Sequence, residues 1–270
     1  MGHSPETSII TLTTDFGLAD HYAGTMKGVL LTRCPTAQIV DISHEIPPFS
    51  IPSGAYTVSQ AAPYFPAGTI HVVVVDPGVG TPRKPILVAA NGQFFIAPDN
   101  GVLTLVMAAD PHAKTREITN RALWLPSPSQ TFHGRDIFAP VAGALASGAV
   151  RAEEVGPALH EVKHLTGLHP ERVDKNTWRG MILSVDHFGN VITNFSVSAF
   201  PQIANRAFAL EAADQKITEF RRTFGDAPQD LCFAYSGSGG YIELGMNQRS
   251  AAAFLGVRAG QRLMLRVTIV

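Results

Sequence analysis

The sequence predicts an α/β protein in two parts: a sheet with helices on its faces, followed by a smaller domain of short strands. Residues 70–75 are almost wholly β-branched, as expected for a strand buried on both faces. Apolar runs alternate with helical patterns up to about residue 165, and shorter strand-like runs separated by turn residues follow. With 270 residues, 45% of them hydrophobic, the chain can bury a sizeable core.

In the first part, the spacing of apolar residues distinguishes strands from helices. The expected strands are 8–14, 37–42, 70–75, 86–90 and 94–97, and the expected helices are 21–32, 53–62, 100–109 and 136–146. Asn91-Gly92 predicts a type I′ hairpin turn between two of these strands. Asp20 stands where a side chain could cap the helix 21–32.

The second part follows a polar segment at 165–176 that contains glycine and proline. We therefore expect a domain of residues 1–165, a linker of residues 166–178 and a second domain of residues 179–270. The expected strands of this domain are 180–185, 190–195, 207–210, 240–244 and 262–270. They predict a small β-barrel or a sandwich.

Charge and composition argue against several classes of partner. The net charge of −1 gives no field that would draw the chain to nucleic acid or to an anionic membrane. No apolar stretch approaches the roughly 20 residues of a membrane span. The first residues lack a basic and apolar signal region, and Cys34 and Cys232 stand far apart. A cytoplasmic protein with two reduced thiols is expected.

Four polar residues of the first part are candidates for chemistry. Asp15 and Asp76 follow two predicted strands, and ligands of open α/β folds collect at the carboxyl ends of strands. Arg83 and His133 lie in loops rich in glycine, proline and serine. Each has an ordinary explanation: Asp15 as a cap, Asp76 as a turn residue, Arg83 as a surface charge and His133 as a structural histidine. Together, a carboxylate, a guanidinium and an imidazole can orient a water molecule.

Two other chemistries have weaker support in the sequence. Carboxylates and imidazoles that could bind a metal are Asp15, Asp20, His21, Asp76, His133 and Asp136. However, there is no HExxH, no His-x-His and no tight aspartate cluster, so no metal is expected. A serine nucleophile would need Gly-x-Ser-x-Gly, and Gly237-Ser238-Gly239 lacks that context.

In the second part, two loops could contact a ligand. Phe188 could stack on a base and the Asn190 amide could pair with its polar edge, or the segment could be a tight turn with a core phenylalanine. The glycine-rich stretch 235–240 could be a hairpin turn or could bring backbone close to a ligand.

In this order, these residues resemble the S-adenosyl-L-methionine (SAM) hydroxide adenosyltransferase family, which is sister to the SAM-dependent fluorinases and chlorinases. The resemblance covers nearly the whole chain. It is carried by Thr14-Asp-Phe-Gly17, Asp41-Ile-Ser-His44, Phe65-Pro-Ala-Gly-Thr69, Val75-Asp-Pro-Gly78, Ile96-Ala-Pro-Asp-Asn-Gly101, Phe132-His-Gly-Arg135, Phe188-Gly-Asn190, Thr193-Asn194, Gly240-Tyr241 and Asn247.

The resemblance implies a Rossmann-like amino-terminal domain with a central, mostly parallel sheet and a small carboxy-terminal β-barrel. It implies a homotrimer, in which SAM binds between the amino-terminal domain of one subunit and the carboxy-terminal domain of the next. Water or hydroxide would attack the 5′ carbon of the ribose and release adenosine and L-methionine. SAM is then the substrate, and no cofactor is expected.

The resemblance also implies roles for individual residues. The catalytic set would be Asp76, Arg83 and His133. The residues expected to bind substrate are Asp15 at the ribose; Phe49 beside the sugar or base; Asp20, Asp186 and Ser238 at the methionine portion; Phe188 and Asn190 at the adenine; and the backbone of Met246 to Gln248 at the base edge.

Departures from the fluorinase pattern favour water as the nucleophile. Fluorinases carry a tyrosine where this chain has Asp76, and Tyr-Ser where it has His133-Gly134. An anionic Asp76 would repel a halide. Gly239 and Met246 replace two arginines of that pattern. The alternatives that stay open are a SAM-dependent halogenase, a SAM- or adenosine-binding module without turnover, and a metal-dependent hydrolase.

Overall fold

The computed structural model describes residues 8–267. The chain divides into two compact units, the first ending at Leu165 and the second beginning at Thr166. The α/β class is confirmed, since a helix-covered sheet forms the first unit and a β-sheet forms most of the second. Within residues 8–267, no helix combines the length and the apolar character that crossing a membrane requires.

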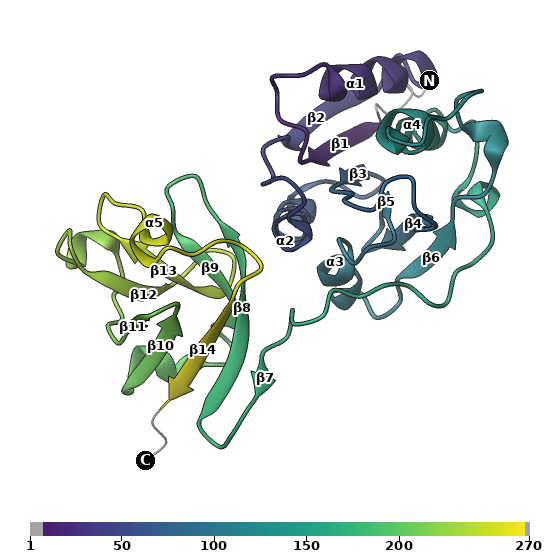
Figure 1. The fold of residues 1–270 in the computed structure, drawn as a ribbon. Helices are drawn as coiled ribbons and strands as arrows, with labels where there is room; N and C mark the ends of the chain where they lie inside the picture. Colours follow the sequence, from purple (N-terminus) through teal and green to yellow (C-terminus); the bar gives the residue numbers. More distant parts are fainter. Residues whose placement is uncertain (1–7, 268–270) are drawn as a thin grey trace, which may run out of the picture. The chain divides into compact units, whose positions relative to one another are not determined.

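The first unit is built on a six-stranded mixed sheet (Figure 1). Its strands are β1 (Ile9–Thr14), β2 (Gln38–Ser43), β3 (Ile70–Val74), β4 (Pro85–Ala90), β5 (Gln93–Pro98) and β6 (Lys114–Glu117). They lie in the order β2-β1-β3-β5-β4-β6, and β2, β1, β3 and β5 are mutually parallel. Strand β4 is antiparallel to both of its neighbours.

Helices cover both faces of this sheet (Figure 1). They are α1 (Tyr22–Arg33), α2 (Ile51–Ala61), α3 (Thr104–Ala108) and α4 (Ala139–Ala146). Met26 and Leu30 of α1 and Val141 of α4 join one buried cluster, whereas Val58 of α2 and Val106 of α3 join another. All five residues of β3 are buried, which explains its β-branched sequence.

The local predictions for the first unit are met in part. Asn91 and Gly92 have φ of 51° and 73°, and β4 pairs with β5, so the predicted type I′ hairpin is confirmed. The prediction that Asp20 caps α1 is wrong: the cap residue is His21, and no side chain caps this helix. The imidazole of His21 instead pairs with Thr25 Oγ1 at 3.0 Å.

Two predicted helices begin later than the sequence suggests. Helix α3 is shorter because residues 100–103 form a turn, in which the Asn100 amide donates to the Val75 carbonyl and Gly101 has a φ of +95°. Residues Gly134–Phe138 form a π-helix that precedes α4. Short 3₁₀-helices, none of them predicted, are Ala62–Tyr64, Arg121–Leu123, Ala152–Val155, Pro201–Ala204 and Phe224–Asp226.

The second unit is an eight-stranded antiparallel sheet curled into a nearly closed barrel. Its strands are β7 (Glu171–Arg172), β8 (Thr177–Val185), β9 (Val191–Ser196), β10 (Phe208–Ala212), β11 (Gln215–Ile217), β12 (Cys232–Ser236), β13 (Tyr241–Met246) and β14 (Arg262–Val267). The end strands β11 and β12 contact each other. Phe195, Leu244 and Leu265 fill the interior, and helix α5 (Ala251–Leu255) packs against it.

The sequence patterns did not predict several elements of the second unit. Strands β11 and β12 and helix α5 were not expected. Residues 166–178, expected as a linker, contain β7 and the first residues of β8, which pair with each other. The last predicted strand is confirmed as β14 up to Val267, and its residues 268–270 lie outside the described residues.

Candidate active site

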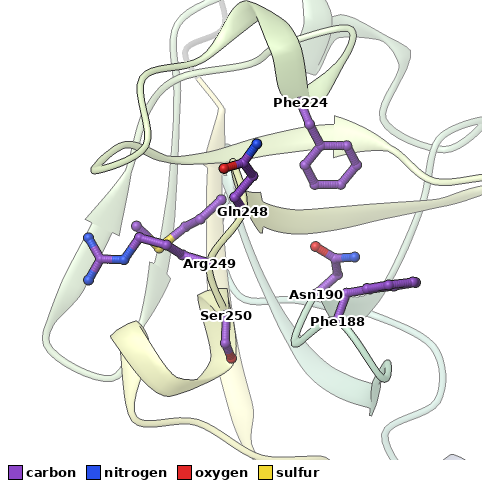
Figure 2. Close-up of a pocket in the computed structure, with 7 residues that line it drawn as sticks. Phe188, Asn190, Phe224, Gln248, Arg249 and Ser250 are labelled. Atoms are coloured by element: carbon purple, nitrogen blue, oxygen red, sulfur yellow. The ribbon is translucent and has the colours of Figure 1, made fainter.

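A cavity of about 410 Å³ opens on the second unit, at the ends of β9 and β13 (Figure 2). Its lining residues are Phe188, Asn190, Phe224, Met246, Gln248, Arg249 and Ser250. Phe188 is 77% exposed, so the alternative that it is a core phenylalanine is wrong. A large exposed ring at a cavity mouth is a platform on which a flat ring can stack.

The Asn190 side chain is oriented by Asp186. Asp186 Oδ2 accepts a hydrogen bond from Asn190 Nδ2 at 2.7 Å, and Asp186 Oδ1 accepts from the backbone amides of Phe188 and Asn190. Because a carboxylate only accepts, the nitrogen of the Asn190 amide must face Asp186. The amide oxygen remains to accept a hydrogen bond from a ligand in the cavity.

The sequence did not single out Phe224, which lines the cavity from a short 3₁₀-helix without any periodic pattern. Gln248 lies in the turn after β13 with a φ of 56°. Gly245 lies against two of the lining residues, since a Cβ there would lie 2.8 Å from the ring of Phe224 and 3.1 Å from Asn190 Oδ1. The absence of a side chain at this position therefore allows both residues to occupy their places at the cavity.

Ser238 does not line this cavity. It is exposed in the turn between β12 and β13, where the Gly240 amide donates to the Gly237 carbonyl. The glycine-rich stretch is thus a hairpin turn, one of the two alternatives drawn from the sequence. Glu243 lies beneath it, accepts a 2.5 Å hydrogen bond from the Tyr235 hydroxyl, and has a pKa raised by burial.

A second cavity, of about 440 Å³, opens on the first unit at the carboxyl ends of β1 and β3. Parallel strands end at the same edge of a sheet, so the loops after β1 and β3 meet there. Its lining residues are Asp15, Phe16, Tyr22, Pro48, Phe49, Val74, Asp76, Val79, Thr131, Phe132, His133 and Gly134. Asp20 is exposed and is not among them.

Asp15 holds the loop that carries Phe49. Asp15 Oδ2 accepts a 2.8 Å hydrogen bond from the Phe49 amide, and Phe49 has a φ of 67° and is 71% exposed. The carboxylate therefore caps no helix. Burial raises the pKa of Asp15 above its ordinary value. Next to it, the Thr14 hydroxyl pairs with Nδ1 of the buried His44 at 2.8 Å, a structural role that the sequence did not reveal.

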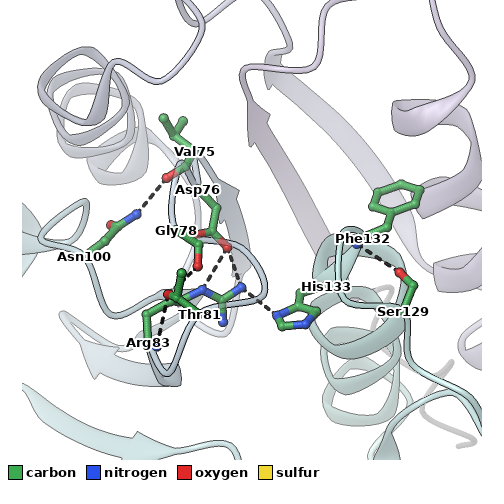
Figure 3. A network of polar contacts seen from close by, with 9 residues as sticks. All are labelled: Val75, Asp76, Gly78, Thr81, Arg83, Asn100, Ser129, Phe132 and His133. Atoms are coloured by element: carbon green, nitrogen blue, oxygen red, sulfur yellow. Dashed lines mark hydrogen bonds and ion pairs between the residues drawn. The ribbon is translucent and has the colours of Figure 1, made fainter.

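Asp76 and Arg83 form a buried ion pair at the end of β3 (Figure 3). Their side chains are 5% and 3% exposed. Arg83 Nε donates to Asp76 Oδ2 at 2.9 Å, and Arg83 Nη2 donates to the same oxygen. The other two polar atoms of the pair, Asp76 Oδ1 and Arg83 Nη1, are buried and have no hydrogen-bond partner. A buried polar atom needs a partner, so Asp76 Oδ1, whose residue lines this cavity, offers an acceptor to a polar ligand.

His133 completes the group from the other loop. Its Nδ1 lies 2.8 Å from Arg83 Nη2 (Figure 3). Since a guanidinium only donates, Nδ1 is the acceptor, and the proton of the neutral ring is on Nε2. Burial and the positive charge of Arg83 lower the pKa of His133; smaller effects of Asp76, Asp136 and the Ser129 backbone act in the opposite direction. His133 is therefore neutral at pH 7.

Close packing of the two loops brings these residues together. The turn after Asp76 is held by Thr81, whose hydroxyl donates to the Gly78 carbonyl at 2.6 Å. At Gly80, with a φ of +78°, a Cβ would lie 2.5 Å from the Gln130 carbonyl oxygen. Only glycine allows this approach of the Asp76 loop to the segment that leads to His133.

The fold and site thus define a class: an α/β domain with a buried acid–guanidinium–imidazole site, joined to a β-barrel with an aromatic cavity. Residues 10–156 match the model of the SAM hydroxide adenosyltransferase N-terminal domain, and residues 180–264 match that of the C-terminal domain. The chain belongs to the SAM hydroxide adenosyltransferase family.

Relatives agree with this assignment. The chain is 40% identical to the (R)-S-adenosyl-L-methionine hydrolase of Salinispora tropica, over 97% of this chain and 98% of that protein. It is 27% identical to the fluorinase of Nocardia brasiliensis, over 96% and 97% of the two chains. A crystal structure of an uncharacterized conserved protein from Thermotoga maritima has a TM-score of 0.84 and 36% identity, and covers 95% of this chain and 99% of that one.

Proposed function

We propose that this protein hydrolyses SAM to adenosine and L-methionine by attack of water on the ribose 5′ carbon. The observation that supports this most directly is the unpartnered buried atom Asp76 Oδ1, whose residue lines the same cavity as Asp15 and is ion-paired with Arg83. Family membership and the names of the hydrolase relatives support the substrate.

The site's chemistry suits this reaction. The sulfonium of SAM is a good leaving group, so no general acid is needed. Free water has a pKa of about 15.7 and is a weak nucleophile. A water in the cavity would donate to Asp76 Oδ1, and the positive charge of Arg83 beside that carboxylate would stabilise developing hydroxide. Alignment behind the C5′–S bond could contribute roughly 7–11 kcal/mol.

The geometry favours Asp76 over His133 as the proton acceptor. In the tautomer that the Arg83 donor requires, Nδ1 of His133 accepts from Arg83 and Nε2 carries the proton, so the ring has no lone pair left for water. Asp76 Oδ1 has lone pairs and no partner. We assign the proton to Asp76, and to His133 the task of holding Arg83.

We also propose which residues contact each part of SAM. Asp15 would accept the ribose hydroxyls, Phe49 would pack beside the sugar, and Phe188 and Asn190 would bind the adenine. Because Asn190 offers its oxygen, it selects a base edge with an amino group, as adenine has. The backbone of Met246 to Gln248 would meet the base edge. Asp20, Asp186 and Ser238 would hold the methionine portion, although Asp186 already orients Asn190.

From the family resemblance we also propose an oligomeric state, a cellular location and a Rossmann-like first domain. A homotrimer would bring the amino-terminal domain of one subunit to the carboxy-terminal domain of the next around SAM. The buried free thiols of Cys34 and Cys232 support a reducing cytoplasm. The parallel strands β2, β1, β3 and β5 support the term Rossmann-like for the first sheet. No cofactor is proposed.

The deciding experiment is incubation with SAM in ¹⁸O-labelled water, followed by mass analysis of the products. Label in the 5′ hydroxyl of adenosine, with release of unlabelled L-methionine, is the expected result. Bound SAM without product would favour a binding module, and 5′-halo-5′-deoxyadenosine formed with chloride or fluoride would favour a halogenase. Loss of activity with a chelator would favour a metal-dependent hydrolase.

The Asp76→Asn variant tests the assigned base. The amide keeps the shape of the side chain but removes its basic oxygen, so we expect turnover to fall about 10²- to 10⁴-fold. Affinity for SAM should change little. Steady-state rates of adenosine release measure this. Asp110→Asn, a carboxylate that accepts from the Asn91 and His112 amides away from the site, is the matched control and should keep full turnover. Full turnover of Asp76→Asn would refute the assignment.

A further inference from the structure

A buried carboxylate outside the proposed catalytic set holds the segment that carries His133. Asp136 is 1% exposed. Its Oδ2 accepts from the Ser129 amide at 2.8 Å and from Arg135 Nη2 at 3.0 Å, and its Oδ1 accepts from Arg135 Nε at 2.6 Å. Burial by itself would raise the pKa of Asp136, but these hydrogen bonds outweigh it and lower the pKa. The carboxylate is therefore ionised where it binds Ser129.

Together these contacts close a small loop around His133. Ser129 Oγ accepts from the Phe132 amide at 3.0 Å (Figure 3), and the Phe132 carbonyl accepts from the amides of Arg135 and Asp136, both at 3.1 Å. The Arg135 guanidinium lies 5.1 Å from the centre of the Phe132 ring. His133 lies inside this closed segment, directly before the π-helix Gly134–Phe138. A π-turn is rare and needs support of this kind.

We propose that Asp136 is a positioning residue for the reaction: by tying Ser129 to the start of the π-helix, it places His133 Nδ1 where it accepts from Arg83 Nη2. His133 then holds the guanidinium in place beside Asp76. The effect on turnover rests on the proposed function, whereas the effect on the His133 ring does not.

The geometry explains why a small change at Asp136 should matter. The hydrogen bond between Nδ1 of His133 and Arg83 Nη2 is 2.8 Å long, and it joins His133 to the ion pair. A displacement of the segment by about 1 Å would break it, and such misplacement can lower a rate about 10²-fold. Asp136 also acts on the ring directly, because its negative charge raises the pKa of His133.

The test is a double-mutant cycle with Asp136→Asn and His133→Ala. We expect Asp136→Asn to lower kcat about 10- to 100-fold in the native background, with the KM for SAM within about twofold. In the His133→Ala background, Asp136→Asn should change kcat less than about twofold. An equal loss of kcat in both backgrounds would show that Asp136 does not act through His133.

A second measurement does not depend on activity. In ¹⁵N-labelled protein, the ring ¹⁵Nδ1 signal of His133 reports the hydrogen bond that Nδ1 accepts from Arg83, and it should shift toward that of a free neutral imidazole in Asp136→Asn. An unchanged Nδ1 signal would overturn the proposal even if kcat fell. If the native protein did not hydrolyse SAM, the proposed function would fail, while this spectrum would still decide the positioning role.

Two further variants separate positioning from folding. Gln93→Ala is the matched control: its buried amide holds another loop by donating to the Ala62 and Phe65 carbonyls at 3.0 and 2.8 Å. It should lower Tm but leave kcat and the His133 Nδ1 signal unchanged. If Asp136→Asn failed to fold, Ser129→Ala would take its place, since it removes the acceptor for the Phe132 amide and the side-chain hydrogen bond of Ser129 to Asp136. It should lower kcat several-fold, and an unchanged kcat would count against the proposal.

Discussion

The hydrogen-bond donors of Arg83 bind both Asp76 and His133. Nε and Nη2 bind one oxygen of Asp76, Nη2 also reaches His133, and Nη1 has no partner. A lysine could not replace it, because a single ammonium group cannot donate in these separate, fixed directions. The guanidinium is thus the residue that connects the proposed base to the imidazole.

The state of His133 sets the pH dependence of the reaction. Burial and the Arg83 charge place its pKa below the ordinary 6.5, so the ring stays neutral as the pH falls through 6.5. Protonation at lower pH would convert Nδ1 into a donor and break its contact with Arg83. We therefore expect kcat to keep its plateau through pH 6.5 and to fall only below it. A pH profile of kcat between 4.5 and 8 measures this, and a midpoint at or above 6.5 would contradict it.

The sequence revealed residues whose chemistry is unusual for their place in the chain. Asp15 and Asp76 could be found because each directly follows a strand, and Arg83 and His133 because charged groups stand out in loops rich in glycine and proline. Phe224 could not be found, and Asp136 was considered only as a possible metal ligand. A phenylalanine in an irregular segment and an acid at the start of a helix both have ordinary explanations, and their roles depend on neighbours distant in the sequence.

At the scale of elements, sequence patterns predicted those helices, strands and turns whose conformation depends on neighbouring residues in the sequence. The β4–β5 hairpin follows from Asn91-Gly92, and β3 follows from its β-branched residues. The π-helix was missed because its apolar spacing differs little from that of the α-helix it precedes. It is revealed by the i→i+5 hydrogen bond that the Ala139 amide donates to the Gly134 carbonyl. Strand β12 was missed because its pairing with β13 and with the segment around Phe220 depends on closure of the barrel.

The hairpin turn gives a prediction for stability. Gly92 has a φ of +73°, which residues other than glycine rarely adopt. A Cβ there would contact only the Cβ of Ala67, at an ordinary van der Waals distance of 3.6 Å. Gly92→Ala should therefore lower the free energy of unfolding by about 1 kcal/mol through backbone strain alone. Gly24→Ala in α1, where nothing lies within 4 Å of the new Cβ, should raise it by about 0.5–1 kcal/mol. Urea unfolding compares the two, and changes of equal sign would refute this account.

At the scale of the whole molecule, the sequence predicted an α/β part followed by a part made of short strands. It did not predict how the strands of either part are arranged. The hydrophobic patterns located most strands of the first unit, yet the order β2-β1-β3-β5-β4-β6 depends on pairings between distant residues. In the second unit, the same short runs were compatible with a barrel or a sandwich. Contact between β11 and β12, which no local pattern encodes, decides for a nearly closed barrel.

The stability of the whole molecule should depend on pH through His71, which lies at the centre of the first sheet. Its ring is 0% exposed, stacks on Phe95 at 4.7 Å between centroids, and pairs with Thr11 Oγ1 at 2.7 Å. Burial lowers its pKa from 6.5 to about 4. Above pH 6.5 the ring is neutral in both the folded and the unfolded chain, and it adds no pH dependence. Between pH 6.5 and 4 only the unfolded chain takes up the proton, so folding becomes less favourable as pH falls.

This depressed pKa predicts a loss of about 3 kcal/mol in the free energy of unfolding between pH 6.5 and pH 4. His71→Gln cannot titrate, and it should flatten that part of the stability curve even if it lowers stability at pH 7. His133→Ala serves as the comparison, since His133 also has a lowered pKa but lies at the cavity, where loosening of the loops can relieve its protonation. Urea unfolding at half-unit pH steps measures all three proteins. If His71→Gln lost stability with acid as steeply as the native protein, the central histidine would not be the group responsible.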